Sequence, residues 1–285
     1  MGEPESHVRQ RLAGALFALV FGATVAGPAA AQSETPNAGP APIDVSVALV
    51  LAVDTSGSVS MSRFELQKQG YAAAFRNPQV LNAIRSLGTQ SIAVTMFQWT
   101  GPFLHVVAAD WALVKDAGSA AAFAGAIDAA PRKLFGGGTS ISGAIDYSRT
   151  LLAQSPYTGA RRIIDVSGDG SNNSGRPAAM ARDEAVADGI GINGLPILTV
   201  EPGLDHYYFA NVIGGPGAFM IPVANYDNFA DAILKKLINE IAAHPETDQI
   251  IVRTASPPWP QTRPSLRQNF AATAIKSDIA ASAAR

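Results

Sequence analysis

The sequence predicts an α/β fold with three layers: a doubly wound, mostly parallel sheet with one antiparallel edge strand, covered by helices on both faces. The segment 45–53 is almost wholly apolar and partly β-branched, as in a strand buried on both faces. Strand-like and helix-like segments then alternate to about residue 243, which is typical of a parallel sheet between helices. Gly101-Pro102 joins two strand-like segments and predicts a hairpin, the source of the antiparallel edge.

The strands are expected where apolar or β-branched residues run between turn residues. Asn193-Gly194 is expected to interrupt the fifth strand, because this pair favours turns. The expected strands are 45–53, 91–99, 103–111, 161–167, 190–200 and 218–223.

The helices are expected where apolar residues recur at helical spacing. Ser60 or Ser62 can cap the first helix, whose apolar stripe includes Phe64, Tyr71 and Phe75. The later helices are expected at 118–130, 140–153, 177–188, 205–213 and 226–243, with Pro177 tolerated in a first turn.

Composition excludes several classes of function. The 285 residues are 47% hydrophobic and 15% charged, with a net charge of −2, so the chain can bury a sizeable core. It lacks the basic character that nucleic-acid binding requires. With no cysteine, the chain forms no disulfide, thiolate metal site or lipid-modified cysteine.

The first 31 residues have the pattern of a signal peptide. Arg9 and Arg11 precede an apolar run, and small residues offer a cleavage site after Ala31. The run is shorter than the roughly 20 residues of a membrane span, so no stable span is expected after cleavage. We expect a bacterial periplasmic or secreted protein with a linker at 32–43, one domain at 44–243 and a poorly ordered, proline-rich tail at 244–285.

Three loops combine hard oxygen atoms with a position at the edge of the sheet where ligands bind in doubly wound folds. They are Asp54 to Ser58 after the first strand, Gly136 to Ser140 before a helix, and Ser167 to Gly170 after a later strand. Carboxylates and hydroxyls suit a small hard cation, Mg²⁺ above all.

Each of these residues also has a purely structural interpretation. Asp54 could form an Asx turn, Thr139 could cap a helix, and Asp169 could lie in a tight turn. Nucleotide binding is disfavoured, because Gly138 stands where a phosphate-binding loop needs lysine.

The five oxygen-bearing residues resemble the metal-ion-dependent adhesion site of the von Willebrand factor A domain family. That site is written D-x-S-x-S, then a distant Thr and a distant Asp, and the resemblance covers roughly 44–243. Four further segments resemble a bacterial, exported subgroup of that family, DUF1194, whose activity is not established: 70–75, 138–144, 165–170 and 213–219. The residues that match the site are Asp54, Ser56, Ser58, Thr139 and Asp169.

The resemblance implies a role for each residue. Ser56 and Ser58 would bind Mg²⁺ (or Mn²⁺ or Ca²⁺) directly, and Thr139 directly or through water. Asp54 and Asp169 would act mostly through water and orient the hydroxyls. One coordination position would remain for a carboxylate from an unknown protein partner.

Binding is favoured over catalysis, because His105, His206 and His244 form no evident nucleophile–base pair. Two alternatives stay open: a metal-dependent hydrolase with Asp165 or Asp169 as base, and a structural envelope protein. Asp165 lies within an apolar strand, so we expect it to be buried in an ion pair or backbone hydrogen bonds, or to support the loop that carries Asp169.

Overall fold

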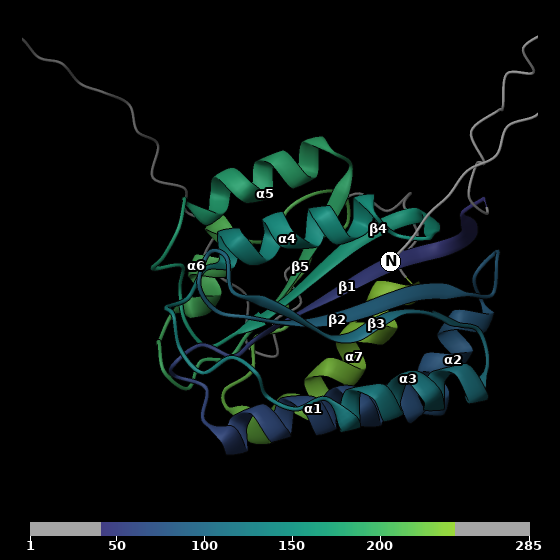
Figure 1. Cartoon of the computed structure of the whole chain (residues 1–285), viewed down its shortest axis with the longest axis horizontal. Helices are drawn as coiled ribbons and strands as arrows, with labels where there is room; N and C mark the ends of the chain where they lie inside the picture. The colour runs from purple at the N-terminus through teal and green to yellow at the C-terminus, as the bar shows by residue number, and fades with distance from the viewer. Residues whose placement is uncertain (1–40, 243–285) are drawn as a thin grey trace, which may run out of the picture. The chain divides into compact units, whose positions relative to one another are not determined.

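A five-stranded sheet forms the middle layer of the protein (Figure 1). The computed structural model describes residues 41–242, so the expected signal peptide, nearly all of the linker and the tail lie outside the described range. The strand order is β3-β2-β1-β4-β5, and the β2–β3 pair is the antiparallel one. The predicted fold class is confirmed. The strands are β1 (Ile43–Asp54), β2 (Ile92–Trp99), β3 (His105–Val114), β4 (Tyr157–Gly168) and β5 (Ile190–Pro196).

Strand β1 lies at the centre and is buried on both faces. Leu49 and Leu51 belong to the core on one face of the sheet, whereas Val50 and Ala52 belong to the core on the other. The strand is therefore apolar without interruption, as the sequence predicted.

Helices cover both faces of the sheet (Figure 1). One face carries α1 (Met61–Arg76), α2 (Pro78–Arg85), α3 (Ala117–Ala129) and α7 (Phe229–Ala242). The opposite face carries α4 (Ile141–Ala153), α5 (Ala178–Ala187) and α6 (Leu204–Asn211). A short 3₁₀ helix, η1 (Tyr226–Asn228), precedes α7.

The edge beyond β5 differs from the sequence prediction. The segment 218–223 forms isolated bridges instead of a regular strand: Met220 pairs with Gly194 of β5, and Val223 pairs with Ile197 just after β5. Pro222 has no N–H to donate to a ladder. Asn193-Gly194 does not interrupt β5, because the Asn193 carboxamide is fixed by Glu240 and by the Phe219 N–H. Strand β5 ends at Pro196, before the predicted residue 200.

Three further boundaries differ from the prediction. Helix α2 was not predicted, although Asn77 caps it and Pro78 occupies its first turn. Strand β4 starts at Tyr157 because its first residues pair with the start of β1. Strand β3 runs from His105 to Val114, later than expected, since the residues before it form the turn.

Helices α1 and α7 approach closely at Gly70. A Cβ atom on Gly70 would lie 2.7 Å from Cδ1 of Phe229 and 3.3 Å from Cα of Ala230. The next residue, Tyr71, packs edge-on against the Phe229 ring at 5.4 Å. Glycine is therefore needed here for packing, although it weakens a helix.

We predict that Gly70→Ala lowers the free energy of unfolding by about 1–3 kcal/mol, because overpacking outweighs the gain in helix propensity. Gly125→Ala in α3 is the matched control, because its added methyl would meet nothing within 4 Å. The control should raise the free energy of unfolding by up to about 1 kcal/mol. Urea denaturation measures both, and a stabilised Gly70→Ala protein would contradict the packing argument.

Candidate metal centre

The first and third candidate loops meet at the carboxyl edge of the sheet. Ser58 Oγ donates a hydrogen bond to Asp169 Oδ1 at 2.5 Å, and the Oγ atoms of Ser56 and Ser58 are 3.3 Å apart. The parallel β1–β4 pairing sets Val53 beside Ser167, which places both loops at one edge. Two segments more than one hundred residues apart in the sequence thus share one cluster of oxygen atoms.

Asp54 ends β1 and is completely buried. Its Oδ1 accepts a hydrogen bond from the Ser56 N–H at 2.7 Å, whereas Oδ2 has no hydrogen-bond partner among the described residues. Burial raises the pKa of Asp54 to about 7, an effect that the backbone hydrogen bond from Ser56 opposes and that nearby Asp169 increases. A buried carboxylate oxygen without a partner is the atom that a cation would satisfy.

Asp169 is also fully buried but has partners that sequence reasoning missed. Its Oδ2 accepts a hydrogen bond from the Tyr226 hydroxyl at 2.8 Å, and Arg63 Nη1 lies 3.5 Å from the same atom. Burial raises the pKa of Tyr226, so its hydroxyl keeps the proton that it donates. Arg63 also donates to the Ser58 carbonyl at 2.8 Å, which holds the two loops together.

Thr139 reaches this edge through the glycine run before α4. Gly137 and Gly138 have φ values of +116° and +82°, a backbone region that glycine adopts readily. A Cβ atom on Gly170 would lie 3.7 Å from Thr139 Oγ1, so the Thr139 hydroxyl lies beside the residue that follows Asp169.

The Thr139 backbone is held by Asn173, which was not predicted as a site residue. Asn173 Oδ1 accepts from the Thr139 N–H at 2.8 Å, and the Asn173 N–H donates back to the Thr139 carbonyl at 2.9 Å. Asn172 likewise accepts from the Ser142 N–H at 3.0 Å. The Asn172-Asn173 pair in a loop of small residues was the sequence signal for this contact.

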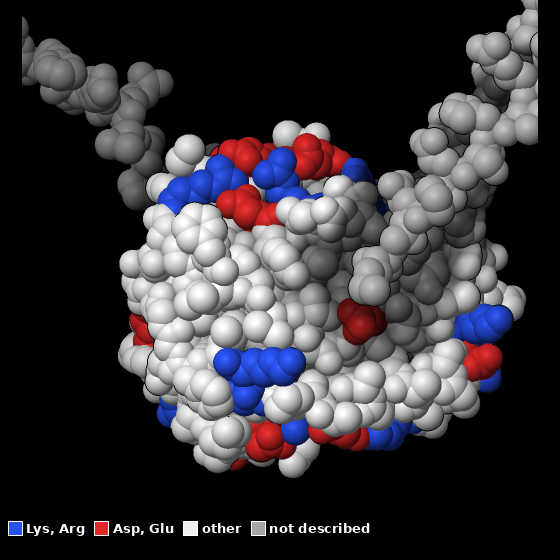
Figure 2. Space-filling model, in the orientation of Figure 1, with Lys and Arg blue, Asp and Glu red and all other residues white. Residues whose placement is uncertain are grey.

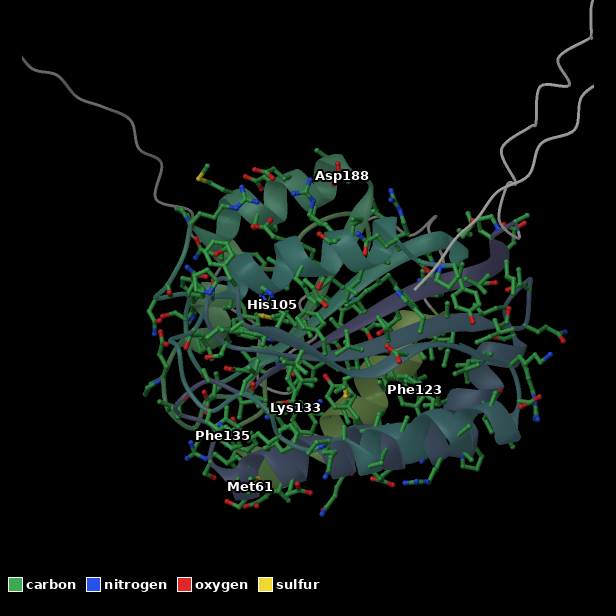
Figure 3. The ribbon with its side chains drawn as sticks, in the orientation of Figure 1. Met61, His105, Phe123, Lys133, Phe135 and Asp188 are labelled. Carbon is green, nitrogen blue, oxygen red and sulfur yellow. The ribbon has the colours of Figure 1, made fainter. Side chains whose placement is uncertain are left out.

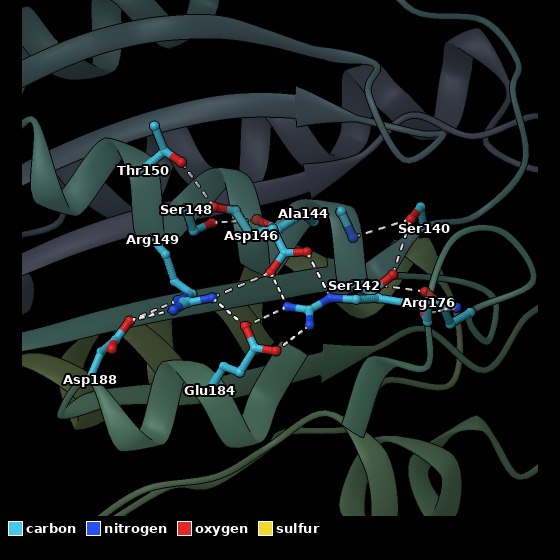
Figure 4. Close-up of polar contacts among 12 residues, drawn as sticks. Ser140, Ser142, Ala144, Asp146, Ser148, Arg149, Thr150, Arg176, Glu184 and Asp188 are labelled. Atoms are coloured by element: carbon cyan, nitrogen blue, oxygen red, sulfur yellow. Dashed lines mark hydrogen bonds and ion pairs between the residues drawn. The ribbon is translucent and has the colours of Figure 1, made fainter. Parts of the chain in front are cut away.

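A charged network fixes the end of the loop that carries Asn172 and Asn173 (Figure 4). Arg176 pairs with Asp146 of α4 and Glu184 of α5, and Arg149 pairs with Glu184 and Asp188. Hydrogen bonds from Arg176 lower the pKa of Glu184 to about 2. These exposed pairs each contribute little to stability, but together they join the loop to both helices.

Two further side chains hold the first loop from behind. Arg132 donates to the carbonyls of Thr55 at 3.0 Å and Ser56 at 3.3 Å, and Gln67 donates to the Asp54 carbonyl at 3.2 Å. Gln67 is fully buried in α1. A glutamine on an apolar helix face was the available sequence signal.

The oxygen atoms present fit a hard divalent cation. The structure supplies the serine hydroxyls, the unpartnered Asp54 Oδ2 and the Asp169 carboxylate, which suit Mg²⁺, Mn²⁺ or Ca²⁺. No group of three or more His, Cys, Asp or Glu residues that could hold a metal occurs in the described part of the chain. Any cation at this edge must therefore rely on hydroxyls as well as carboxylates.

The other candidate residues lie in different surroundings. Asp165 is fully buried in an ion pair, with its Oδ1 2.5 Å from Lys236 Nζ, which confirms the ion-pair alternative. His105 stacks on Tyr147 with ring centroids 4.6 Å apart. Trp99 and Tyr208 are fully buried and therefore form no exposed recognition surface.

The strand order and the helices on both faces of the sheet give this protein a von Willebrand factor A-like α/β fold. The family model described as "Protein of unknown function (DUF1194)" matches residues 44–245. The chain therefore belongs to the DUF1194 family, which confirms the resemblance predicted from sequence.

Two solved structures illustrate the likeness of fold. A von Willebrand factor type A protein from Catenulispora acidiphila is 17% identical with a TM-score of 0.51, over 69% of this chain and 43% of that one. Proximal thread matrix protein 1 from the mussel byssus, described with a zinc-occupied MIDAS motif, is 14% identical with a TM-score of 0.50, over 70% of this chain and 49% of that one. This chain thus spans less than half of either protein. A search of curated proteins finds no match.

We predict that Asp54→Asn stabilises the metal-free protein at alkaline pH. Because burial raises the pKa of Asp54 from 3.8 to about 7, this group contributes stability at acidic pH that is lost as pH rises through about 7. In EDTA near pH 8, the variant should gain about 1–3 kcal/mol of unfolding free energy, and much less near pH 5.

Urea denaturation at the two pH values measures this effect. Asp44 lies at the exposed start of the same strand, so Asp44→Asn is the control. It should change the free energy of unfolding little at either pH. If both variants changed the free energy of unfolding equally, the ionised Asp54 carboxylate would not destabilise the metal-free protein, and the prediction would be wrong.

Proposed function

We propose that this protein is an exported, cation-dependent protein-binding module, located in the periplasm or secreted. Ser56, Ser58, Thr139, Asp54 and Asp169 would hold Mg²⁺, or Mn²⁺ or Ca²⁺, and an acidic group of a partner would complete the coordination. The observation that carries the proposal is the contact between Ser58 and buried Asp169, beside a buried Asp54 oxygen without a partner. The zinc-occupied MIDAS motif of the mussel protein, on a similar fold, supports it.

The residues of this chain divide the work between binding and orientation. Ser56 and Ser58 would offer their hydroxyl oxygens to the cation, and Thr139, whose hydroxyl lies beside Gly170, would add a third. Asp169 accepts a hydrogen bond from the Ser58 hydroxyl, which would leave the Ser58 lone pairs free for the cation. The bound cation would supply an electrophilic position for a partner carboxylate.

The loops around this edge expose apolar side chains. Phe103 is 93% exposed in the turn between β2 and β3, and Phe135 is 62% exposed in the segment before α4. Met61 begins α1 directly after the first loop and is 53% exposed, on the same side of the molecule as Phe135 (Figure 3). Exposed apolar groups near a binding position are typical of protein interaction surfaces.

Basic groups accompany the apolar ones. The Arg132 guanidinium lies 5.0 Å from the centre of the Phe135 ring while it binds the first loop. Lys133 lies beside them, and a basic group there stands on an otherwise largely uncharged face in Figure 2. A partner with an acidic residue next to apolar ones would match this surface in charge and polarity.

The geometry does not favour a hydrolase. Asp165, one of the two candidate bases, pairs with Lys236 of α7. Asp169, the other, already accepts hydrogen bonds from Ser58 and Tyr226.

No helix in the described range is long and apolar enough to cross a bilayer.

We predict that Ser58→Ala weakens Mg²⁺ binding by about tenfold to a hundredfold, because it removes a hydroxyl ligand and its link to Asp169. Ser62→Ala, an exposed hydroxyl one turn away, is the matched control and should bind as the wild type does. Titration calorimetry with Mg²⁺ and Mn²⁺, together with the cation-dependent shift in thermal unfolding, measures both. A wild-type protein that gives neither heat nor shift would contradict the proposal.

We predict that Phe135→Ala lowers the affinity for the partner by about 1–2 kcal/mol while it leaves Mg²⁺ binding intact. Capture from an envelope extract by the immobilised full chain, with Mg²⁺ or EDTA, measures the retained partner. Met180→Ala on α5 is a control with a similarly exposed apolar residue and should retain the partner. Undiminished capture in EDTA would contradict a cation-dependent contact.

A further inference from the structure

A lysine and two carboxyl groups lie together in the interior between β4 and α7. Lys236 and Glu240 belong to α7, and Asp165 belongs to β4. All three are at most 1% exposed. Lys236 Nζ lies 2.5 Å from Asp165 Oδ1 and also contacts Glu240 Oε1. This cluster takes no part in the candidate metal centre.

The two carboxyl groups meet the lysine in different ways. Glu240 Oε1 accepts a hydrogen bond from Lys236 and another from Asn193 Nδ2 at 3.0 Å. Neither oxygen of Asp165 has a hydrogen-bond partner within residues 41–242, although Nζ lies closer to Oδ1 than the lower limit of about 2.7 Å for an N–H···O bond. The amine therefore approaches the Asp165 carboxyl in contact distance but without hydrogen-bond alignment.

The surroundings disfavour two ionised carboxyl groups. One ammonium cannot compensate two buried carboxylates, and burial raises the pKa of Asp165 and that of Glu240, the latter to about 7. Arg161 also faces this cluster but donates to the backbone carbonyls of Glu240 and Ile241. The Tyr71 hydroxyl bonds to Ser167, and the Phe219 ring lies 5.6 Å from Nζ.

We propose that Lys236 and Asp165 join in an intramolecular isopeptide bond, with Glu240 as a group that transfers a proton. The Nζ lone pair attacks Cγ of Asp165, a C–N bond forms, and one C–O bond breaks with its electron pair leaving on oxygen. Before the attack, one proton passes from the Lys236 ammonium to the Asp165 carboxylate, so that an amine faces a carboxyl group. After the attack, Nζ gives up one further proton through Glu240 to the departing hydroxyl, which leaves as one water molecule. The step needs no oxidant, reductant or cofactor, and exclusion of water from the site favours the amide over its hydrolysis.

The bond would tie the closing helix to the strand that leads to Asp169. In a chain without cysteine, it supplies a covalent crosslink of the kind that disulfides give many exported proteins. It also goes beyond the proposed function, because it forms with or without a cation at the edge of the sheet.

Mass spectrometry of the purified, denatured full chain tests the proposal. The expected mass is lower than that of the sequence, after any signal cleavage, by one water molecule. Tryptic digestion should give a branched peptide that joins the segment containing Asp165 to the one containing Lys236. A succinimide at Asp169-Gly170 would also lose one water, so the branched peptide is the decisive result.

Three variants sharpen the test. Lys236→Arg keeps the charge but cannot form the bond, and Glu240→Gln removes the proton carrier, so both should keep the full mass. Asp165→Asn should form the same amide by loss of ammonia, which gives a product with the mass of the crosslinked wild type. A wild-type protein of full mass with no branched peptide would overturn the proposal and leave an ion pair in its place.

Discussion

Parallel pairing of β1 with β4 is the constraint on which the candidate metal centre depends. The pairing runs from Ile43 beside Tyr157 to Val53 beside Ser167, so the loops after both strands leave the sheet at the same edge. A shift of one residue would turn every side chain of β1 to the other face and break both core layers. The observed register places Asp54 and Ser58 beside Asp169.

This arrangement brings two carboxylates together in the interior, and the protein holds them unequally. Asp169 accepts hydrogen bonds from Tyr226 and Ser58 and forms an ion pair with Arg63. Oδ2 of Asp54, by contrast, has no hydrogen-bond partner among the described residues. Burial and repulsion make the metal-free state less favourable when Asp54 is ionised. A bound cation would offset both the burial of the Asp54 carboxylate and its repulsion from Asp169. The buried charges that destabilise the metal-free protein would therefore favour the cation-bound one.

The sequence predicted the three layers and the antiparallel edge strand, because these depend on patterns local in the chain. The five candidate site residues rest on local patterns too, and their role in metal binding stays a prediction. The apolar run before Asp54 and the glycines before Thr139 are such patterns. Arg63, Asn173 and Tyr226 were missed, because each touches the site through a contact set by the packing of distant elements. The segment 218–223 was mispredicted as a strand, because its alternation gave no sign that pairing with β5 would reduce to bridges.

Strand β4 connects the two buried acidic clusters of the protein. Asp169 follows its end, whereas Asp165 lies within the strand and faces Lys236 of α7. Tyr226, which donates to Asp169, lies in η1 immediately before the helix that carries Lys236. Any displacement of α7 along the sheet would thus disturb both the contact to Asp165 and, through η1, the Tyr226–Asp169 hydrogen bond. A covalent Lys236–Asp165 link would hold α7 at that level on β4 and thereby keep Tyr226 in place, so that Asp169 stays oriented toward Ser58 whether or not a cation is bound.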